Sequence, residues 1–253
     1  MTRLALFTSP HNPRWKDIRR AAAKGILTRD GLAVCEGPHL LAEALKSPVR
    51  VMAVYAVRSA ARKLPRDVDY IEVGDNLFES FSGTETPQGV LALVEPPEAS
   101  LADFAGEGLV LALDGVQDPG NAGALVRAAE AFGAAGVAFL RGSVSPWNPK
   151  SIRASAGSLF RLPVAAGVPA EALSALGAPL YALMPAAGES PEDAPLAEGG
   201  VVVVGGEGQG VSPAVRAAAR PLRIPTQGVE SLNAAVAGAI VLYEAARQRG
   251  RVR

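Results

Sequence analysis

The chain has 253 residues, of which 49% are hydrophobic, and it carries 25 basic and 25 acidic side chains. This length and apolar content are enough to bury at least one hydrophobic core and predict two domains. One cysteine and two histidines exclude an intrachain disulfide and are too few for a typical zinc site. The longest uncharged apolar stretch, Ala234 to Tyr243, is about half of the ~20 residues that cross a bilayer. We therefore expect a cytoplasmic protein without a metal or a membrane segment.

The balanced charge is unevenly distributed along the chain. Residues 1–66 hold 13 basic and 4 acidic side chains, and the remaining residues carry the compensating negative charge. Such an asymmetry predicts that the first part binds a polyanion. A helix there would present cations to phosphates, and its tryptophan could stack on a base. The alternative is a solvated helix face with the tryptophan in the core. The candidate RNA contacts are Arg14, Trp15, Lys16, Arg19 and Arg20.

The pattern up to residue 94 predicts a small α/β domain. Short β-branched runs (51–57, 68–73 and 89–94) alternate with a helical pattern from Pro38 to Lys46. Cys35 lies in another strand-like run, where a buried inert thiol is expected. The segment Glu95 to Gly108 mixes proline, glycine and acidic residues and is typical of a linker. We therefore expect domains at 1–97 and 107–253.

After the linker, strands and helices alternate. The expected strands are Leu109 to Leu113, Gly136 to Leu140, Leu180 to Met184, Val201 to Val204 and Leu222 to Ile224. The expected helices are Pro119 to Phe132, one near Lys150 to Ser155, a short one from Ser212 and a long one from Ser231. Nearly continuous apolar strands in this order predict an α/β fold whose parallel sheet has helices on both faces.

The first of three chemically distinctive segments follows the strand that ends at Leu113. Asp118 suits a helix N-cap and Pro119 the first helical position, so Asn121 should lie in the first turn. Leu125, Ala129 and Phe132 have the spacing of a core stripe. Arg127 is rotated by about 200° from Leu125 and would be free to serve a ligand, the alternative being an ordinary surface arginine.

The second segment is the glycine-rich run Gly205 to Gly210 at the end of a buried strand. Glycines let the backbone approach a ligand closely, although a tight turn alone would also need them. The run lacks the G-x-G-x-x-G spacing of dinucleotide sites and the G-K-[ST] phosphate signature. Glu207 would repel a phosphate. A ligand with positive charge, or with hydroxyl or amine donors, is therefore favoured.

The third segment places Ile224 and Pro225 at a strand end, before Ser231 and Asn233. Ser231 is expected to cap the last helix, with Asn233 in its first turn. The apolar stripe expected for that helix is Leu232, Val236, Ile240 and Tyr243. Ligands of open parallel sheets bind beyond the carboxyl ends of the strands, where all three segments fall. We therefore expect one pocket built from three loops.

Three motifs in this order resemble the signature motifs of the SpoU (TrmH) family of RNA ribose 2′-O-methyltransferases. They are Asn121 with Arg127, Glu207 in a glycine-rich loop, and Ile224-Pro225 followed by Ser231 and Asn233. Residues 8–94 are similar to the L30e-like substrate-binding domain that many members carry. The resemblance implies a deep trefoil knot in the C-terminal domain and a homodimer formed through it. It also implies S-adenosylmethionine bound at Gly205, Gly206, Ile224 and Leu232.

The resemblance further implies a catalytic set of Arg127, Asn121, Glu207, Ser231 and Asn233. Arginine stays protonated, so Arg127 is expected to stabilise the developing alkoxide and hold RNA phosphate, and Glu207 is the candidate proton acceptor. The expected substrate is ribosomal (23S) RNA first and tRNA second. A non-catalytic RNA-binding factor for ribosome assembly is the main alternative. A small-molecule enzyme of the Rossmann type is disfavoured by the missing dinucleotide spacing.

Overall fold

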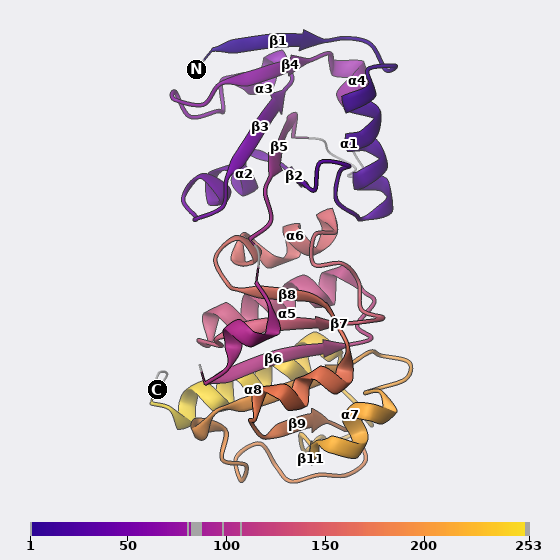
Figure 1. Ribbon diagram of the computed structural model, residues 1–253, viewed down its shortest axis with the longest axis vertical. Coiled ribbons are helices and arrows are strands. Elements are labelled where there is room, and N and C mark those ends of the chain that lie inside the picture. Colours follow the sequence, from indigo (N-terminus) through magenta and orange to yellow (C-terminus); the bar gives the residue numbers. More distant parts are fainter. Residues whose placement is uncertain (1, 80, 82–87, 98, 107, 251–253) are drawn as a thin grey trace. The chain divides into compact units, whose positions relative to one another are not determined.

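The computed structural model describes residues 2–79, 81, 88–97, 99–106 and 108–250, which group into two compact units (Figure 1). Unit 1 comprises residues 1–97 together with 147–161, and unit 2 comprises residues 98–146 together with 162–253. The expected domain limits assigned 147–161 to the second domain, whereas this segment packs with unit 1. Its helix α6 (Pro149–Ser155) lies against strand β2 (Ala33–Glu36).

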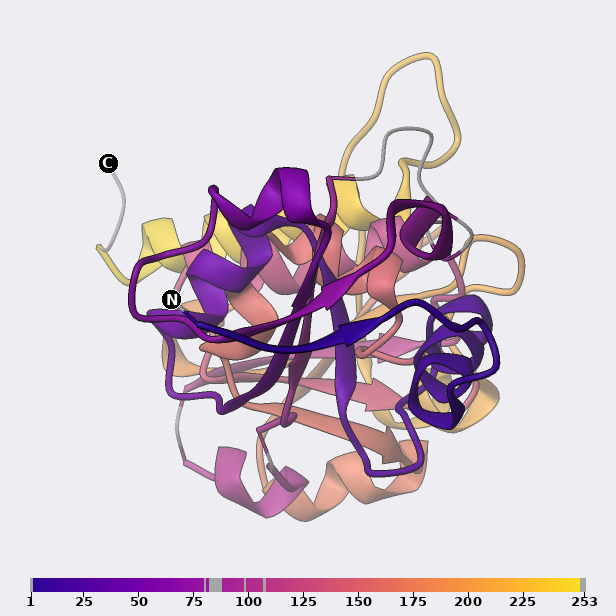
Figure 2. The ribbon, with the colours of Figure 1, turned by 90° about the horizontal axis from the view of Figure 1, so that it is seen from above.

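Unit 1 contains a mixed five-stranded sheet in the order β1-β4-β3-β5-β2. Figure 2 shows β1, in indigo, running parallel beside β4. The expected strands at 51–57, 68–73 and 89–94 are present as β3, β4 and β5, whereas β1 was not expected. Besides β2, the strands are β1 (Arg3–Phe7), β3 (Val51–Ala56), β4 (Tyr70–Val73) and β5 (Val90–Val94). Besides α6, the helices are α1 (Pro13–Lys24), α2 (Pro38–Leu45), α3 (Arg58–Ala61) and α4 (Asp75–Glu79).

Trp15 lies in the core of unit 1, so its expected role in base stacking is wrong. Its side chain is 0% exposed, on the buried face of α1 with Ile18 and Ala21. Its ring lies 5.5 to 6.4 Å from the rings of Tyr55, Phe78 and Phe81. The spacing of the three buried α1 residues matches one helix face, and aromatic clustering holds the tryptophan there. Cys35 is also buried, which raises the pKa of its thiol and keeps it inert.

Unit 2 contains a six-stranded sheet in the order β11-β9-β10-β6-β7-β8, and every pairing in it is parallel, as expected. Strand β8 was not expected, and β11 ends where the predicted strand begins, at Leu222. The strands are β6 (Leu109–Asp114), β7 (Gly136–Leu140), β8 (Val164–Val168), β9 (Leu180–Leu183), β10 (Gly200–Gly205) and β11 (Arg220–Leu222). The main helices are α5 (Pro119–Ala131), α7 (Pro213–Ala218) and α8 (Ala234–Gln248).

Both faces of this sheet are covered. In Figure 2, α8, in yellow, lies on one side of the strands, and the 3₁₀ helix η3 (Ala170–Leu176), in salmon, lies on the other. Helix α5 packs against α8, and α7 packs against η3. The expected linker contributes a further 3₁₀ helix, η1 (Leu101–Phe104), whose Phe104 is buried in the core on the η3 side. The remaining 3₁₀ helices are η2 (Ser158–Phe160) and η4 (Leu196–Glu198).

Helix α8 differs from its prediction in its start and in its buried face. Its N-cap is Asn233 and not Ser231. The expected apolar stripe is largely exposed, with Val236 at 49%, Ile240 at 38% and Tyr243 at 41%. The buried face consists of Val241, Leu242 and four small residues, Ala234, Gly238, Ala245 and Ala246, and the small residues let α8 approach α5 and β10 closely. A Cβ added to Gly238 would lie 2.3 Å from a methyl of Leu125. Helices can approach this closely only where side chains are small.

Candidate active site

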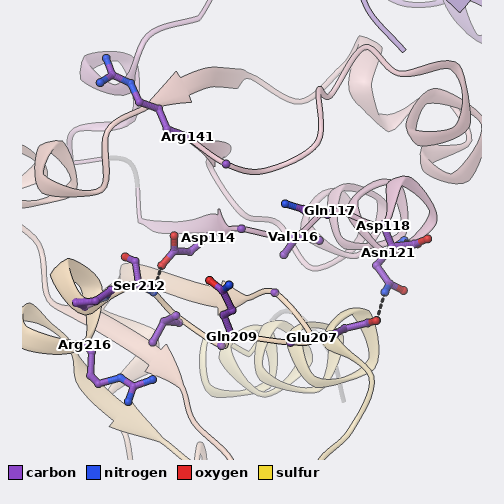
Figure 3. Close-up of a pocket in the computed structure, with 17 residues that line it drawn as sticks. Asp114, Val116, Gln117, Asp118, Asn121, Arg141, Glu207, Gln209, Ser212 and Arg216 are labelled. Carbon is purple, nitrogen blue, oxygen red and sulfur yellow. Dashed lines mark hydrogen bonds between the residues drawn. The ribbon is translucent and has the colours of Figure 1, made fainter. Parts of the chain in front are cut away.

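The three distinctive segments meet beside the carboxyl ends of β6 and β10, within unit 2. The Asn121 side-chain amide donates a short hydrogen bond to Glu207 Oε1 (Figure 3). The Asn233 amide donates to Asn121 Oδ1 at 3.1 Å and to Glu207 Oε1 at 3.3 Å. Residues separated by up to 112 positions therefore form one hydrogen-bonded cluster. The expected juxtaposition of these three side chains is present.

Helix caps hold the two asparagines of this cluster. The Asp118 carboxylate accepts a hydrogen bond from the Asn121 backbone N–H at 2.7 Å and caps α5, as expected. Asn233 Oδ1 accepts from the N–H groups of Ala235 and Val236, which leaves its Nδ2 to donate to Asn121 and Glu207. One end of the Asn233 amide therefore caps α8 while the other orients the carboxylate.

The glycine-rich loop positions Glu207 through close backbone approaches. A Cβ added to Gly205 would lie 2.3 Å from the carbonyl carbon of Gly210, and one added to Gly206 would lie 2.2 Å from the Gly115 oxygen. The Gly210 N–H donates to the Gly206 carbonyl at 2.9 Å and closes the loop. Gly205 and Gly206 are required because a side chain at either position would clash with neighbouring backbone. The loop therefore has a defined shape and is more than a flexible connection.

Two cavities lie on either side of this loop, and both are lined by Gly206 to Gly210. Cavity B, of about 570 Å³, is lined by all four residues expected to bind the cofactor and by Ser231 and Asn233. Cavity A, of about 830 Å³, is lined by Asn121, by residues 114–118 and by two arginines, Arg141 and Arg216 (Figure 3). Glu207 and Arg216 border both cavities, whereas Arg141 borders cavity A alone. The cofactor-binding residues expected in cavity B are Gly205, Gly206, Ile224 and Leu232.

Arg127 is the expected catalytic residue that the structure does not bring to the cluster. It is exposed on α5, as its helical position predicted, but it lines neither cavity. Its guanidinium makes no hydrogen bond or ion pair with the described residues. Since α5 packs against α8, the exposed Arg127 lies on the helix pair that also carries the exposed apolar face of α8.

The expected RNA contacts on α1 are only partly available. Arg20 is engaged with the Asp17 carboxylate at 2.7 Å, and Arg14 Nε donates to the Tyr55 hydroxyl at 2.8 Å. Lys16 and Arg19 are exposed and make no ion pair within the part of the chain that the structure describes. The basic face of α1 that remains is therefore narrower than expected.

Several lining residues were missed by the sequence analysis. Cavity B includes Leu183, Met184 and Pro185 at the end of β9, together with Thr226 and Glu230. The β9 residues could have been found, because β9 neighbours β10 and its carboxyl end meets the same edge of the sheet. Arg141 follows β7 in the same way.

The described residues contain no cluster of three or more His, Cys, Asp or Glu side chains suited to a metal ion. No helix among them is long and apolar enough to cross a membrane.

Family comparisons agree with this geometry. The family described as "SpoU rRNA Methylase family" matches residues 108–243, and the "MRM3-like substrate binding domain" matches residues 12–92. The chain belongs to the SpoU rRNA methylase family. This confirms the expected family, and the second match confirms a substrate-binding domain in front of the SpoU domain.

Relatives of the SpoU family align along nearly the whole chain. The Bacillus subtilis 23S rRNA (guanosine(2553)-2′-O)-methyltransferase RlmP is 34% identical over 242 residues, covering 93% of this chain and 96% of the relative. The Streptomyces viridochromogenes SpoU methyltransferase AviRb, solved with AdoMet, has a TM-score of 0.83 at 28% identity and covers 96% of this chain and 100% of that one. An AdoMet-bound rRNA methyltransferase from Sinorhizobium meliloti has a TM-score of 0.81 at 29% identity, covering 96% and 97%.

Proposed function

We propose that this protein transfers a methyl group from S-adenosylmethionine to a ribose 2′-hydroxyl of ribosomal RNA, with 23S rRNA the first candidate and tRNA the second. The observation that carries the proposal is the Asn121–Glu207–Asn233 cluster, which borders two cavities in a SpoU family chain. The 34% identity to RlmP, named a 23S rRNA 2′-O-methyltransferase, supports the choice of rRNA.

Cavity B fits the methyl donor. Its volume of about 570 Å³ lies in the range of small-molecule sites. Leu183, Ile224 and Leu232 offer apolar walls, and the carboxylates of Glu207 and Glu230 suit a cationic ligand. A Cβ at Gly205 or Gly206 would meet the backbone of Gly210 or Gly115, so these glycines set the shape of the loop that lines cavity B. When bound, S-adenosylmethionine supplies an electrophilic methyl group on a sulfonium.

The chain's own residues must activate the ribose hydroxyl, which is a poor nucleophile until its proton is lost. Asn121 and Asn233 both donate to Oε1 of Glu207, which fixes the carboxylate. Glu207 Oε2 makes no hydrogen bond with the described residues and can accept the 2′-hydroxyl proton. Ser231, exposed in cavity B beside Asn233, orients the bound donor or ribose. Arg127 stabilises the developing alkoxide through its permanent charge.

A homodimer would bring Arg127 to this site. The exposed Val236, Ile240 and Tyr243 have helical spacing and form one apolar face on α8, which a second copy can cover. Phe132 of α5 packs edge-on against Tyr243 and extends this face. Arg127 is exposed on the same α5, so it can reach the partner's Glu207 rather than its own.

Mixing two inactive variants tests this assignment. Arg127→Ala and Glu207→Gln should each abolish methylation of rRNA, and Arg127→Ala should leave S-adenosylmethionine affinity nearly unchanged because Arg127 lines neither cavity. If Arg127 acts on the partner, mixed dimers regain one complete site, and equal mixing restores about a quarter of wild-type activity. If Arg127 acts within its own chain, the mixture stays inactive. Unchanged activity in Arg127→Ala alone would remove Arg127 from the mechanism.

Unit 1 is proposed to hold structured RNA. The excess of basic residues in 1–66, with Lys16 and Arg19 exposed on α1, supports phosphate contacts. We place the protein in the cytoplasm, with its rRNA substrate.

We also propose that the C-terminal segment threads a loop of unit 2 to form the trefoil knot. The loop between β9 and β10 lies against β11, where Glu189 bridges Leu222 and its carbonyl accepts from Arg223 N–H at 2.9 Å. After this contact the chain returns to pack α8 on β10 and α5. A chain pulled from both ends should then retain a tightened knot and extend less than its full contour length.

A further inference from the structure

Cavity A is a second hollow beside the cluster. It is the larger of the two, at about 830 Å³, and the glycine-rich loop that closes one side of it also lines cavity B. In Figure 3, Asp114 and Ser212 lie between Arg141 and Arg216, and Gln117 and Gln209 lie to the right of them, toward Asn121 and Glu207. Asn121 and Glu207 lie on its border, so anything held in cavity A is next to the carboxylate that the two asparagines orient.

Cavity A is bordered by two arginines with free N–H groups and by Glu207, whose Oε2 is the proposed proton acceptor. Arg141 and Arg216 are both exposed, and the Arg216 guanidinium makes no hydrogen bond or ion pair with the described residues. Arg141 uses only Nε, which donates to the Gly167 carbonyl at 3.3 Å. The two aspartates of cavity A are engaged within the chain. Asp114 is 5% exposed and accepts from Ser212 N–H at 2.6 Å, and Asp118 accepts from Asn121 N–H at 2.7 Å. A guanidinium with free N–H groups matches the geometry of phosphate oxygens.

We infer that cavity A receives the target nucleotide of the RNA, unstacked from its neighbours, and that Arg141, which borders cavity A alone, holds a phosphate next to it. This inference rests on the proposed function. In-line methyl transfer needs the ribose and the donor on opposite sides of the reacting atoms, which the two cavities around Glu207 provide. The amides of Gln117 and Gln209 can pair with the edge of a base, and only an unstacked base exposes that edge within a pocket.

The test is the salt dependence of RNA binding. The Kd of 23S rRNA from cells lacking this chain is measured at several salt concentrations with wild type, Arg141→Ala and Arg141→Lys. Loss of one phosphate contact should lower the slope of log Kd against log salt by about 0.7 to 0.9, a change that a merely structural role does not produce. Arg141→Lys should restore the slope. The matched control is Arg220→Ala, because Arg220 is exposed on β11 and lines neither cavity.

Two further readouts separate the possible results. Gln117→Leu should lower kcat/KM for the RNA without changing the salt slope, since it removes a base contact and no charge. The Kd for S-adenosylmethionine should stay within about twofold in Arg141→Ala, less than ~0.5 kcal/mol. An Arg141→Ala slope equal to that of Arg220→Ala would overturn the inference, and so would a loss of cofactor affinity in place of RNA affinity. RNA binding is measured without turnover and is therefore independent of methylation. A wild-type protein that binds RNA but methylates none would contradict the proposed function without contradicting the inference about cavity A.

Discussion

Each side chain of the central cluster has a distinct physical task. Glu207 carries the charge, and the two asparagine amides fix its direction by donating to the same oxygen. Asn233 performs this task with the half of its amide that does not cap α8. The sequence predicted the set because all three residues follow strand ends. It could not predict that Asn233, rather than Ser231, caps the helix, since both residue types suit that position.

Trp15 shows the limit of prediction at this scale. A tryptophan between cations fits both RNA stacking and a helix core, and only the packing of Tyr55, Phe78 and Phe81 around it decides. We predict that Trp15→Ala lowers the free energy of unfolding by about 3 to 5 kcal/mol in urea titrations. Lys16→Ala, its exposed neighbour, should change it by less than about 0.5 kcal/mol. A folded Trp15→Phe protein that lost RNA affinity would contradict the buried role.

At the scale of elements, the glycine-rich loop is the most constrained part of the site. We predict that Gly205→Ala raises the Kd for S-adenosylmethionine about 10- to 100-fold, because a Cβ there meets backbone and overpacking costs about 1 to 3 kcal/mol. Gly208→Ala is the matched control, since a Cβ at Gly208 has nothing within 4 Å. Isothermal titration calorimetry of both variants checks this. Equal effects of the two substitutions would mean that the loop is not held by close contact.

Helix α8 carries two faces, and the face that the sequence predicted as buried is the exposed one. The buried face holds Val241, Leu242 and four small residues, whereas Val236, Ile240 and Tyr243 are exposed. We predict that Ile240→Glu converts a dimer to monomers in analytical ultracentrifugation and removes methylation, because Arg127 then has no partner site. At the far end of α8, Gln248 Oε1 accepts from the Ala197 N–H and its Nε2 donates to the Pro191 carbonyl. The Gln248 side chain is therefore bound within its own chain and is not part of the face that a second copy would cover. A wild-type monomer would contradict the dimer.

At the scale of the whole molecule, the sequence predicted two domains and a parallel sheet. It did not predict that residues 147–161 return to unit 1 before the chain continues in unit 2. Alternating strands and helices fix the second sheet because each apolar strand is buried on both faces. The assignment of 147–161 to unit 1 depends on contacts such as Arg153 with Glu36 at 3.5 Å, which join distant positions. Periodicity carries no information on such pairings, and none on a knot.

The measurement that tests the proposed function most directly is a map of ribose 2′-O-methylation along the rRNA of three strains. One strain has the wild-type chain, one lacks it, and one carries Glu207→Gln. We predict one ribose that is methylated only in the first strain, because loss of the proton acceptor slows transfer by about 100-fold or more. An identical methylation map in all three strains would contradict the assignment of this chain as an rRNA 2′-O-methyltransferase.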